Sequence, residues 1–178
     1  MQPWPRSFDD VIVEDFAGER LDHEWNFIRH PRRGNYRLGE RPGCLTLLGA
    51  ATSIDSMEQP TWLGRRQRHI HCTAQTLLHF APGDEPQSAG EGQEAGLSVY
   101  QNWMHHYDVA IVRRRHRNWI VLRRRIGSLV AEEACLPIDA GSLHLRVEAD
   151  ARGYAFHISP DGEAWRPLSW GEARYLST

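Results

Sequence analysis

The chain has 178 residues and a formal net charge of −2 at neutral pH, and all of its basic side chains apart from histidine are arginine. This length suits a single domain, residues 1–178, with a substantial hydrophobic core. The small net charge favours neither nucleic acid nor an anionic membrane as a partner. No apolar run approaches the length of a membrane span.

Three cysteines, Cys44, Cys72 and Cys135, stand far apart in the sequence. An odd number of dispersed cysteines argues against a disulfide framework, and Cys72 and Cys135 fall in apolar strand patterns typical of reduced core residues. The first residues lack the charged start and the apolar middle of a signal peptide. We therefore predict a cytoplasmic location, with residues 1–7 as an N-terminal extension.

Asp9, Asp10, Glu14 and Asp15 form an acidic cluster near the start of the chain. Glycoside hydrolysis needs two carboxyl groups about 5–10 Å apart, and calcium is bound by groups of such oxygens. Because nothing nearby builds a pocket, we interpret the cluster as a solvated turn. The alternatives are a calcium site that includes Asp15 and a catalytic pair; we predict no other metal, no cofactor and no catalytic residue.

Apolar and polar residues alternate from His69 to Phe80, which predicts a long strand with one drier face. His69 and His71 share the other face. Because no third ligand stands at zinc-binding spacing, we expect that face to be polar and exposed. The following stretch, residues 82–94, is rich in Gly, Pro, Ser and acidic residues and predicts an exposed loop.

Two strands joined by a turn are predicted between Glu94 and Val112, because apolar residues alternate on both sides of the turn. Hydrogen-bonding and aromatic side chains gather at the turn, at Gln101, Asn102, Trp103, His105, His106 and Tyr107. Amide, imidazole and aromatic groups together suit a sugar, which offers hydroxyl groups at its edge and C–H groups on its face. These six turn residues are the candidate carbohydrate-binding site. In the competing interpretation Asn102 fixes the turn and both histidines are simply exposed.

Arginine runs flank the next predicted hairpin, at residues 113–115, 117 and 123–125. Arginine beside an aromatic residue can contact phosphate and stack on bases. Consecutive arginines on a strand, however, point to both faces, and Glu132 and Glu133 on the following strand can pair with them. We therefore expect a solvated, ion-paired face and no nucleic-acid partner.

Further strands are predicted at residues 119–126, 129–136, 143–149 and 154–159, with Gly- and Asp-rich turns between them and no convincing helix. Strands at this regular spacing indicate an all-β sandwich or barrel, and we favour the sandwich. Trp25 is expected to pack inward. The other expected core residues are Leu97, Val99, Tyr107, Val109, Ile111, Leu145, Val147, Phe156 and Ile158.

The segment Ala95-Gly-Leu-Ser-Val-Tyr-Gln-Asn, followed by His105-His-Tyr, resembles the C-terminal β-sandwich of family 43 glycoside hydrolases, the β-xylosidases and α-L-arabinofuranosidases. Other segments follow in the family's order from about residue 8 to the end. They include residues 13–16 as an opening strand, 21–29, 41–47, 65–69 as the start of a long strand, 145–165 and 176–178. The resemblance implies an antiparallel, concanavalin A-like jelly roll of two sheets.

The resemblance also implies parts that this sequence does not contain. Family members carry their catalytic acids in an N-terminal five-bladed propeller and close the sandwich with strands beyond the position of Thr178. We therefore expect no hydrolysis by this chain alone and an open sheet edge that a second copy, a swapped segment or residues 1–10 covers. Some β-xylosidases reach into the catalytic domain with an aromatic residue that has no counterpart in residues 90–94.

Three functions remain open at this point. The first is a non-catalytic accessory β-sandwich that supports a glycosidase propeller, in which case the turn residues are interdomain contacts. The second is an autonomous, lectin-like module that binds pentose oligosaccharides through the same residues. The third is a structural interaction domain that forms homo-oligomers or recruits a partner through its open edge. We favour the first.

Overall fold

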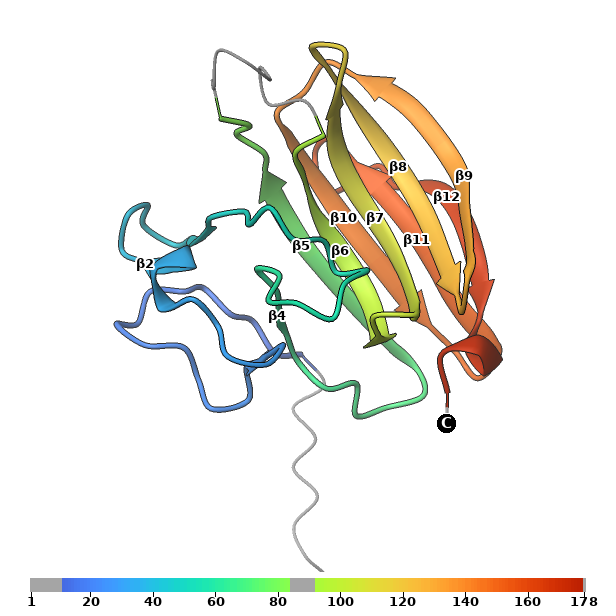
Figure 1. The fold of residues 1–178 in the computed structure, drawn as a ribbon, viewed down its shortest axis with the longest axis horizontal. Helices are drawn as coiled ribbons and strands as arrows, with labels where there is room; N and C mark the ends of the chain where they lie inside the picture. Colours follow the sequence, from blue (N-terminus) through green and yellow to red (C-terminus); the bar gives the residue numbers. More distant parts are fainter. Residues whose placement is uncertain (1–10, 84–91, 178) are drawn as a thin grey trace, which may run out of the picture.

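The largest feature of the structure, a computed structural model that describes residues 11–83 and 92–177, is a sheet of four consecutive antiparallel strands (Figure 1). These strands are β6 (Glu94–Asn102), β7 (His105–Arg114), β8 (Arg117–Ile126) and β9 (Leu129–Ile138). They pair in sequence order. The two hairpins predicted from the alternation of apolar residues are therefore confirmed.

Tight turns set the register of this sheet. Arg115 and His116 join β7 to β8 with φ angles of 49° and 62°, a combination that fits the type I′ turn favoured in hairpins because its twist matches that of the strands. Gly127 follows β8 with a φ of 63°, which glycine adopts without the steric cost of a side chain.

The second sheet is also antiparallel and has the strand order β12-β11-β10-β5. Its strands are β5 (Cys72–His79), β10 (Ser142–Ala149), β11 (Gly153–Ser159) and β12 (Arg166–Glu172). The sequence did not predict β12, where a proline and a glycine break the alternation. Pro167 is tolerated because β12 lies at the edge of the sheet.

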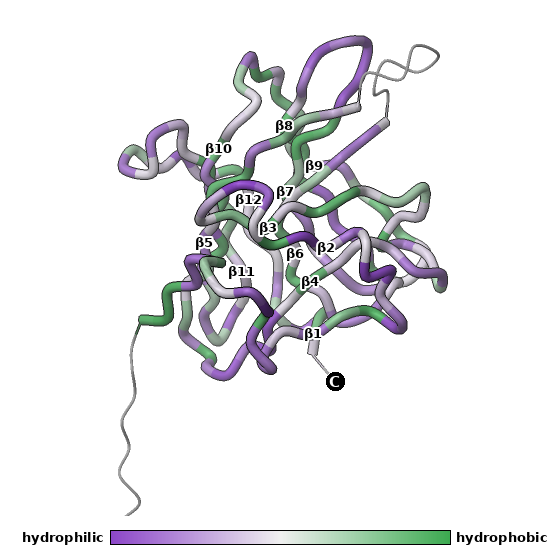
Figure 2. Tube along the Cα trace, turned by 90° about the vertical axis from the view of Figure 1, so that its left-hand side faces the viewer, coloured by the Kyte–Doolittle hydropathy of each residue, from purple (hydrophilic) through white to green (hydrophobic). Residues whose placement is uncertain are grey.

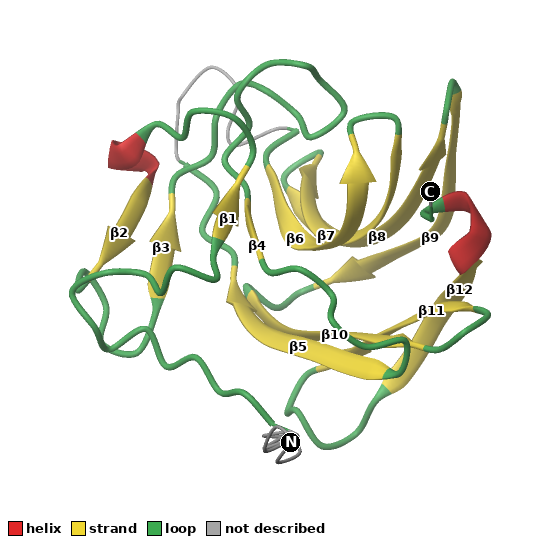
Figure 3. Cartoon of the chain, turned by 90° about the horizontal axis from the view of Figure 1, so that it is seen from below, coloured by secondary structure: helices red, strands yellow, loops and turns green. Residues whose placement is uncertain are grey.

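The hydrophobic core lies between the two sheets, which face each other in Figure 3. The core residues are Tyr107, Val109, Ile111, Ile120, Leu122, Leu143, Leu145, Val147, Phe156 and Ile158. This confirms seven of the nine strand residues expected there, and the other two, Leu97 and Val99, are half-buried and pack against the core.

Tyr107 connects the two sheets. Its hydroxyl donates a hydrogen bond of 2.9 Å to the carbonyl oxygen of Glu172 in β12. A Cβ atom at Gly171 would stand 2.5 Å from the Tyr107 ring, so the ring needs glycine at that position. Burial raises the pKa of Tyr107 to about 12. The phenol therefore stays protonated and donates its hydrogen bond at neutral and mildly alkaline pH.

Residues 11–71 form a layer of short elements beside the sandwich, here called the N-terminal layer (Figure 1). Within this layer β1 (Asn26–Phe27) pairs with β4 (Leu63–Gly64), and β2 (Tyr36–Leu38) pairs with β3 (Leu45–Leu47). Pro60 is its only buried residue. The layer therefore has no hydrophobic core of its own.

The expected opening strand at residues 13–16 is not formed. The Glu14 carboxylate accepts a hydrogen bond from the backbone N–H of Phe16 at 3.1 Å, and the Asp15 carboxylate accepts one from the N–H of Ala17 at 3.0 Å. Phe16 has a left-handed backbone with a φ of 50°. Side-chain capping of this kind competes with a strand ladder and turns the chain instead.

Trp25 does not reach the sandwich core, contrary to expectation. It is half-buried within the N-terminal layer, where its ring centroid lies 5.8 Å from that of Phe16 and 5.0 Å from the guanidinium carbon of Arg65. Its indole N–H donates to the Glu14 carboxylate at 3.1 Å. This hydrogen bond satisfies the indole N–H and helps to fix Trp25 within the N-terminal layer.

The three cysteines are free. Cys72 is half-buried, and burial raises the pKa of its thiol. Cys135 is exposed, so its assignment to the core is wrong. It lies on the edge strand β9 opposite Val121, on the side of the sheet that faces away from the core.

The described residues contain two short helical turns, η1 (Arg33–Asn35) and η2 (Ala173–Tyr175). No helix in this part of the chain is long and apolar enough to cross a membrane. Hydrophobic and hydrophilic residues instead alternate along the chain (Figure 2). Of the predicted loop at residues 82–94, residues 84–91 lie outside the described part, as does the expected extension at 1–7.

Candidate functional site

Alternation along β7 separates two adjacent candidate residues. Tyr107 points into the core, whereas His106 and Asp108 point to the opposite face of the sheet. Both are nevertheless buried, with exposed fractions of 2% and 4%. A buried histidine and a buried aspartate on the outside of a sheet require a cover, and the N-terminal layer provides it through Asp55.

His106 lies between two carboxylates. Its Nδ1 atom is 3.1 Å from Asp108 Oδ1, and its Nε2 atom is 3.1 Å from Asp55 Oδ1. A protonated imidazole can donate to both at once. The bond to Asp55 joins residues that are 51 positions apart in sequence, and it fixes the N-terminal layer on the sheet.

Arginines on β8 complete this arrangement. Arg123 donates two hydrogen bonds to Asp108, of 3.0 and 2.8 Å, and forms an ion pair with Glu94 at 2.9 Å. Arg125 donates to Asp55 at 2.9 Å. Together with His106 these residues form a continuous row of acidic and basic side chains, here called the charge network. Pairing of this kind is what makes the burial of charged groups tolerable.

The network keeps Asp55 and Arg123 ionised. Burial raises the pKa of the Asp55 carboxyl, but hydrogen bonds from Arg125 and the nearby His106 outweigh that effect and lower the pKa overall. Burial likewise lowers the pKa of Arg123, yet Asp108 and Glu94 raise it above the usual arginine value. At neutral pH both groups therefore stay charged and paired.

Aromatic side chains extend this contact between the layer and the sandwich. Tyr100 of β6 stacks on His106 with ring centroids 5.8 Å apart, and the Trp62 ring lies 5.4 Å from that of Tyr100. The Tyr36 hydroxyl in turn donates to the carbonyl of Trp62 and accepts from its N–H, each at 3.0 Å. The face around His106 is thus filled by the chain's own side chains.

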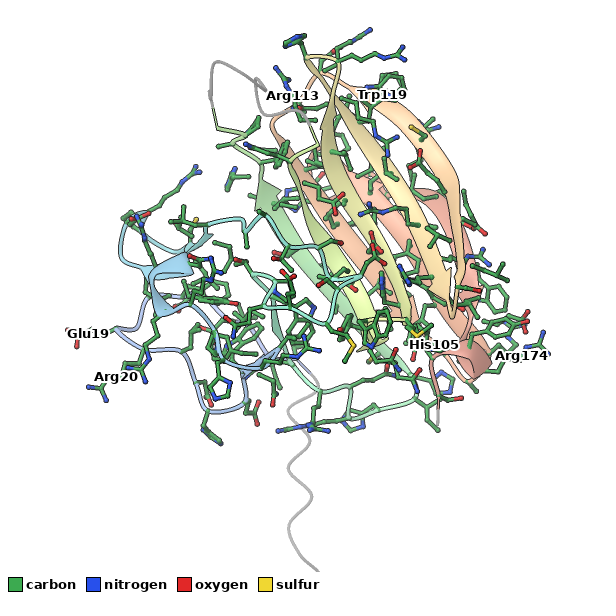
Figure 4. All side chains as sticks on the ribbon, viewed as in Figure 1. Glu19, Arg20, His105, Arg113, Trp119 and Arg174 are labelled. Carbon is green, nitrogen blue, oxygen red and sulfur yellow. The ribbon has the colours of Figure 1, made fainter. Side chains whose placement is uncertain are left out.

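The turn between β6 and β7 holds the remaining candidates. Asn102 Oδ1 accepts the backbone N–H of Met104 at 2.8 Å and lies 3.3 Å from His105 Nδ1. The Arg125 guanidinium lies 5.6 Å from the centre of the Trp103 ring. Gln101, Asn102, Trp103 and His105 are all half-buried, and Figure 4 places His105 at the same end of the molecule as Arg174 in η2.

The structure thus divides the six turn residues into two groups. His106 and Tyr107 are buried and their polar atoms are engaged, while the other four lie at or beside the turn, partly open to solvent. The prediction that Asn102 fixes the turn is confirmed. The companion prediction that both histidines are exposed is wrong for His106, because the N-terminal layer covers it.

Of the acidic cluster, the structure describes Glu14 and Asp15. Asp15 is exposed and its carboxylate caps a turn, while Asp9 and Asp10 lie outside the described residues. Within residues 11–83 and 92–177, no three His, Cys, Asp or Glu side chains are close enough to hold a metal ion.

The arginine runs are paired as predicted. Arg114 forms an ion pair with Glu132 at 2.7 Å, and Arg124 forms one with Glu133. Arg124 also donates to the carbonyl oxygen of Trp170 in the opposite sheet at 2.5 Å.

Sequence reasoning missed the charge network. Asp108 interrupts an otherwise apolar run, which was a usable signal for a buried charge with a partner. Asp55 gave no such signal, since it lies in a polar loop far from β7 in the sequence.

Residues 13–178 match the model of the β-xylosidase C-terminal concanavalin A-like domain, a domain of family 43 glycoside hydrolases. The chain belongs to this family. Its two antiparallel four-stranded sheets are the sandwich that the family assignment implies.

Curated relatives are longer proteins. The chain is 32% identical over 151 residues to the non-reducing end α-L-arabinofuranosidase BoGH43B of Bacteroides ovatus, covering 84% of this chain and 27% of that protein. It is 31% identical over 162 residues to a putative β-xylosidase of Escherichia coli K12, covering 87% and 29%. The family 43 domain described here therefore spans less than a third of either relative.

Solved structures agree with the fold. The Bacteroides ovatus xyloglucan PUL GH43B superposes with a TM-score of 0.82 at 30% identity, over 92% of this chain and 31% of that one. The GH43 protein BlXynB of Bacillus licheniformis gives the same TM-score and coverage at 22% identity, a likeness that concerns the fold alone. In these relatives the sandwich accompanies a family 43 catalytic domain.

Proposed function

We propose that this chain is a non-catalytic accessory β-sandwich that supports the catalytic propeller of a β-xylosidase or α-L-arabinofuranosidase. The observation that carries the proposal is the match of residues 13–178 to a domain that is C-terminal in its family and spans under a third of the relatives' length. The two carboxylates that flank His106, those of Asp55 and Asp108, are paired with His106 and with two arginines.

The N-terminal layer supports an interdomain role. It exposes large apolar side chains although it has no core: Val11, Ile12 and Val13 are 75%, 61% and 82% exposed, and Met57 is 65% exposed. The run of three exposed apolar residues from Val11 to Val13 is the kind of surface that another domain covers. We assign this layer and the neighbouring turn residues Gln101, Trp103 and His105 to the contact with the propeller.

Complex formation tests this assignment. Sedimentation of the chain with the separately produced propeller domain of a family 43 enzyme should show a one-to-one complex. Val13→Asp should weaken that complex at least about tenfold, because it places a charge in a desolvated apolar contact. Leu129→Asp is the matched control, since Leu129 is 73% exposed but lies on β9, away from the layer. Equal weakening by both variants would remove the N-terminal layer from the interface.

A cytoplasmic location belongs to the same proposal and is supported by the three free thiols. Fractionation of cells that produce the full protein tests it, and recovery from the medium or the cell envelope contradicts it.

A further inference from the structure

The sheet β12-β11-β10-β5 has an outer face, directed away from the core (Figure 3). Cross-strand pairing aligns Thr73, Glu148, Ala155 and Trp170 in one row on it. The neighbouring residue Val147 points into the core, so alternation places this row on the outside.

Trp170 is a fixed aromatic surface within this row. It is 43% exposed, and a Cβ atom at Gly153 would stand 2.5 Å from Cζ2 of its indole. The ring therefore lies directly against the backbone of β11, where only glycine leaves room. The hydrogen bond from Arg124 to the Trp170 carbonyl holds this part of β12 on the opposite sheet. A ring fixed in this way loses little conformational entropy when a ligand stacks on it.

A cavity of about 500 Å³ opens beside the indole. Small residues, among them Gly153 and Ala155, form part of its lining. The polar side chains that line it are His71, Thr73, Glu148, Asp150 and Arg152. The volume lies within the range of small-molecule sites, and the mixed lining offers both an aromatic surface and hydrogen-bonding groups.

The charged side chains that line this cavity are paired with opposite charges. Arg152 pairs with Asp150 at 3.3 Å, and Glu148 pairs with Arg146 at 3.5 Å. Asp150 also accepts the backbone N–H groups of Arg152 and Gly153, at 2.7 and 2.8 Å, which fixes the β10–β11 turn in place. Paired charges of both signs favour a neutral ligand that both donates and accepts hydrogen bonds, rather than a phosphate or a cation.

We propose that Trp170 and this cavity bind a neutral pentose oligosaccharide. A sugar ring stacks its C–H face on the indole, while Thr73, Glu148 and Arg152 hydrogen-bond its hydroxyl groups. The pentose class rests on the proposed function, since relatives are named as xylosidases and arabinofuranosidases; the position of the site rests on the geometry alone. This site lies on the other sheet from the six turn residues.

Chemical-shift titration of the chain with xylotetraose and with an arabino-oligosaccharide tests the proposal. We expect saturable binding of at least one, with a dissociation constant of about 1 mM for so shallow a site. Trp170→Ala should weaken it about tenfold, in line with the energies of aromatic stacking. Thr73→Val, which keeps the β-branched shape and removes the hydroxyl, should weaken it about threefold and serves if Trp170→Ala folds poorly.

Tyr175→Ala is the matched control, because it removes another exposed aromatic ring, 36% exposed in η2, from outside the cavity. Its affinity should equal that of the wild type. The inference is overturned by the absence of binding, by shifts confined to residues 101–107, or by unchanged affinity in both cavity variants. It is also overturned if Trp170→Ala abolishes self-association or the propeller complex, because the face is then a protein interface. A chain that forms the propeller complex but binds neither sugar refutes this inference and leaves the accessory role standing.

Discussion

His106 contacts two carboxylates at once, one on its own strand and one on a loop of the N-terminal layer. Its partner Asp108 also accepts both hydrogen bonds from Arg123. Removing one member of such a buried set leaves the others desolvated and unpaired, which costs more than the pair contributes when intact. At the scale of single residues, the charge network is therefore the most sensitive point of the structure outside the core.

Asp108→Ala should lower the free energy of unfolding by about 3 kcal/mol, because it leaves the Arg123 guanidinium and His106 without their shared carboxylate. Urea denaturation measures this loss. Asp139→Ala is the matched control: the Asp139 side chain is 96% exposed and lies 3.5 Å from Arg117, so its removal should change stability by less than about 0.5 kcal/mol. A loss for Asp108→Ala no larger than that of the control would show the network to be energetically neutral.

Asp161 provides a pH-dependent prediction. Its carboxylate accepts the backbone N–H groups of Ala164 and Glu163, both at 2.9 Å, and the Ser159 hydroxyl at 2.8 Å, and these bonds lower its pKa from 3.8 to about 2. Because the folded pKa lies below the unfolded one, the stabilisation is complete above about pH 4 and is lost as the pH falls towards 2. Asp161→Asn replaces the accepting carboxylate oxygen with an amide oxygen, which still accepts hydrogen bonds, and removes the titration, so the unfolding free energy of this variant should fall less steeply between pH 4 and pH 2. Parallel curves for the two proteins would contradict this linkage.

At the scale of elements, the long strands could be predicted because most of them bury one side and alternate in hydropathy, while β7 and β8 carry apolar runs that are buried on both faces. Strands β5 to β11 all lie where these patterns placed them. Strand β12 could not be predicted, because its outer residues include Trp170 and its pairing tolerates Pro167 only through its edge position. The short pairs β1–β4 and β2–β3 have two or three residues each and no core to impose a period.

The candidate site could likewise be predicted only where it depends on local sequence. The turn at Asn102 is a local hydrogen-bonding pattern and could be read from neighbouring residues. The partnership of His106 with Asp55 depends on how the N-terminal layer packs, which no local pattern encodes. The contact between Gly153 and the Trp170 ring likewise joins neighbouring strands. It can be predicted only when β12 is known to pair with β11.

Core packing between the sheets can be tested on one strand. Leu145 is fully buried in β10, and Leu145→Ala should lower the free energy of unfolding by about 2–5 kcal/mol, through lost burial and the cavity left behind. Leu129→Ala makes the same chemical change at an exposed position of β9 and should cost under about 1 kcal/mol. Similar denaturation midpoints for the two variants would show that Leu145 does not lie in a packed core.

At the scale of the whole molecule, the sandwich is well packed and the N-terminal layer beside it is not. The sheets enclose a continuous core, whereas residues 11–71 contact the outer face of the β6–β9 sheet through the charge network and a few aromatic side chains. A layer with this little burial is poorly stabilised by its own contacts, and a second domain that covers it would add to its stability. This asymmetry is what an accessory domain attached to a larger enzyme requires, and it agrees with the length of the relatives.

The most direct test of the accessory role is hydrolysis of an aryl β-xyloside and an aryl α-L-arabinofuranoside by the chain alone, by a family 43 propeller produced without its sandwich, and by the two mixed. We predict no turnover by the chain alone and a saturable rise in the propeller's activity or half-life as the chain is added. Turnover by the purified chain, or a propeller whose activity and half-life do not respond to it at any ratio, would contradict the proposed function.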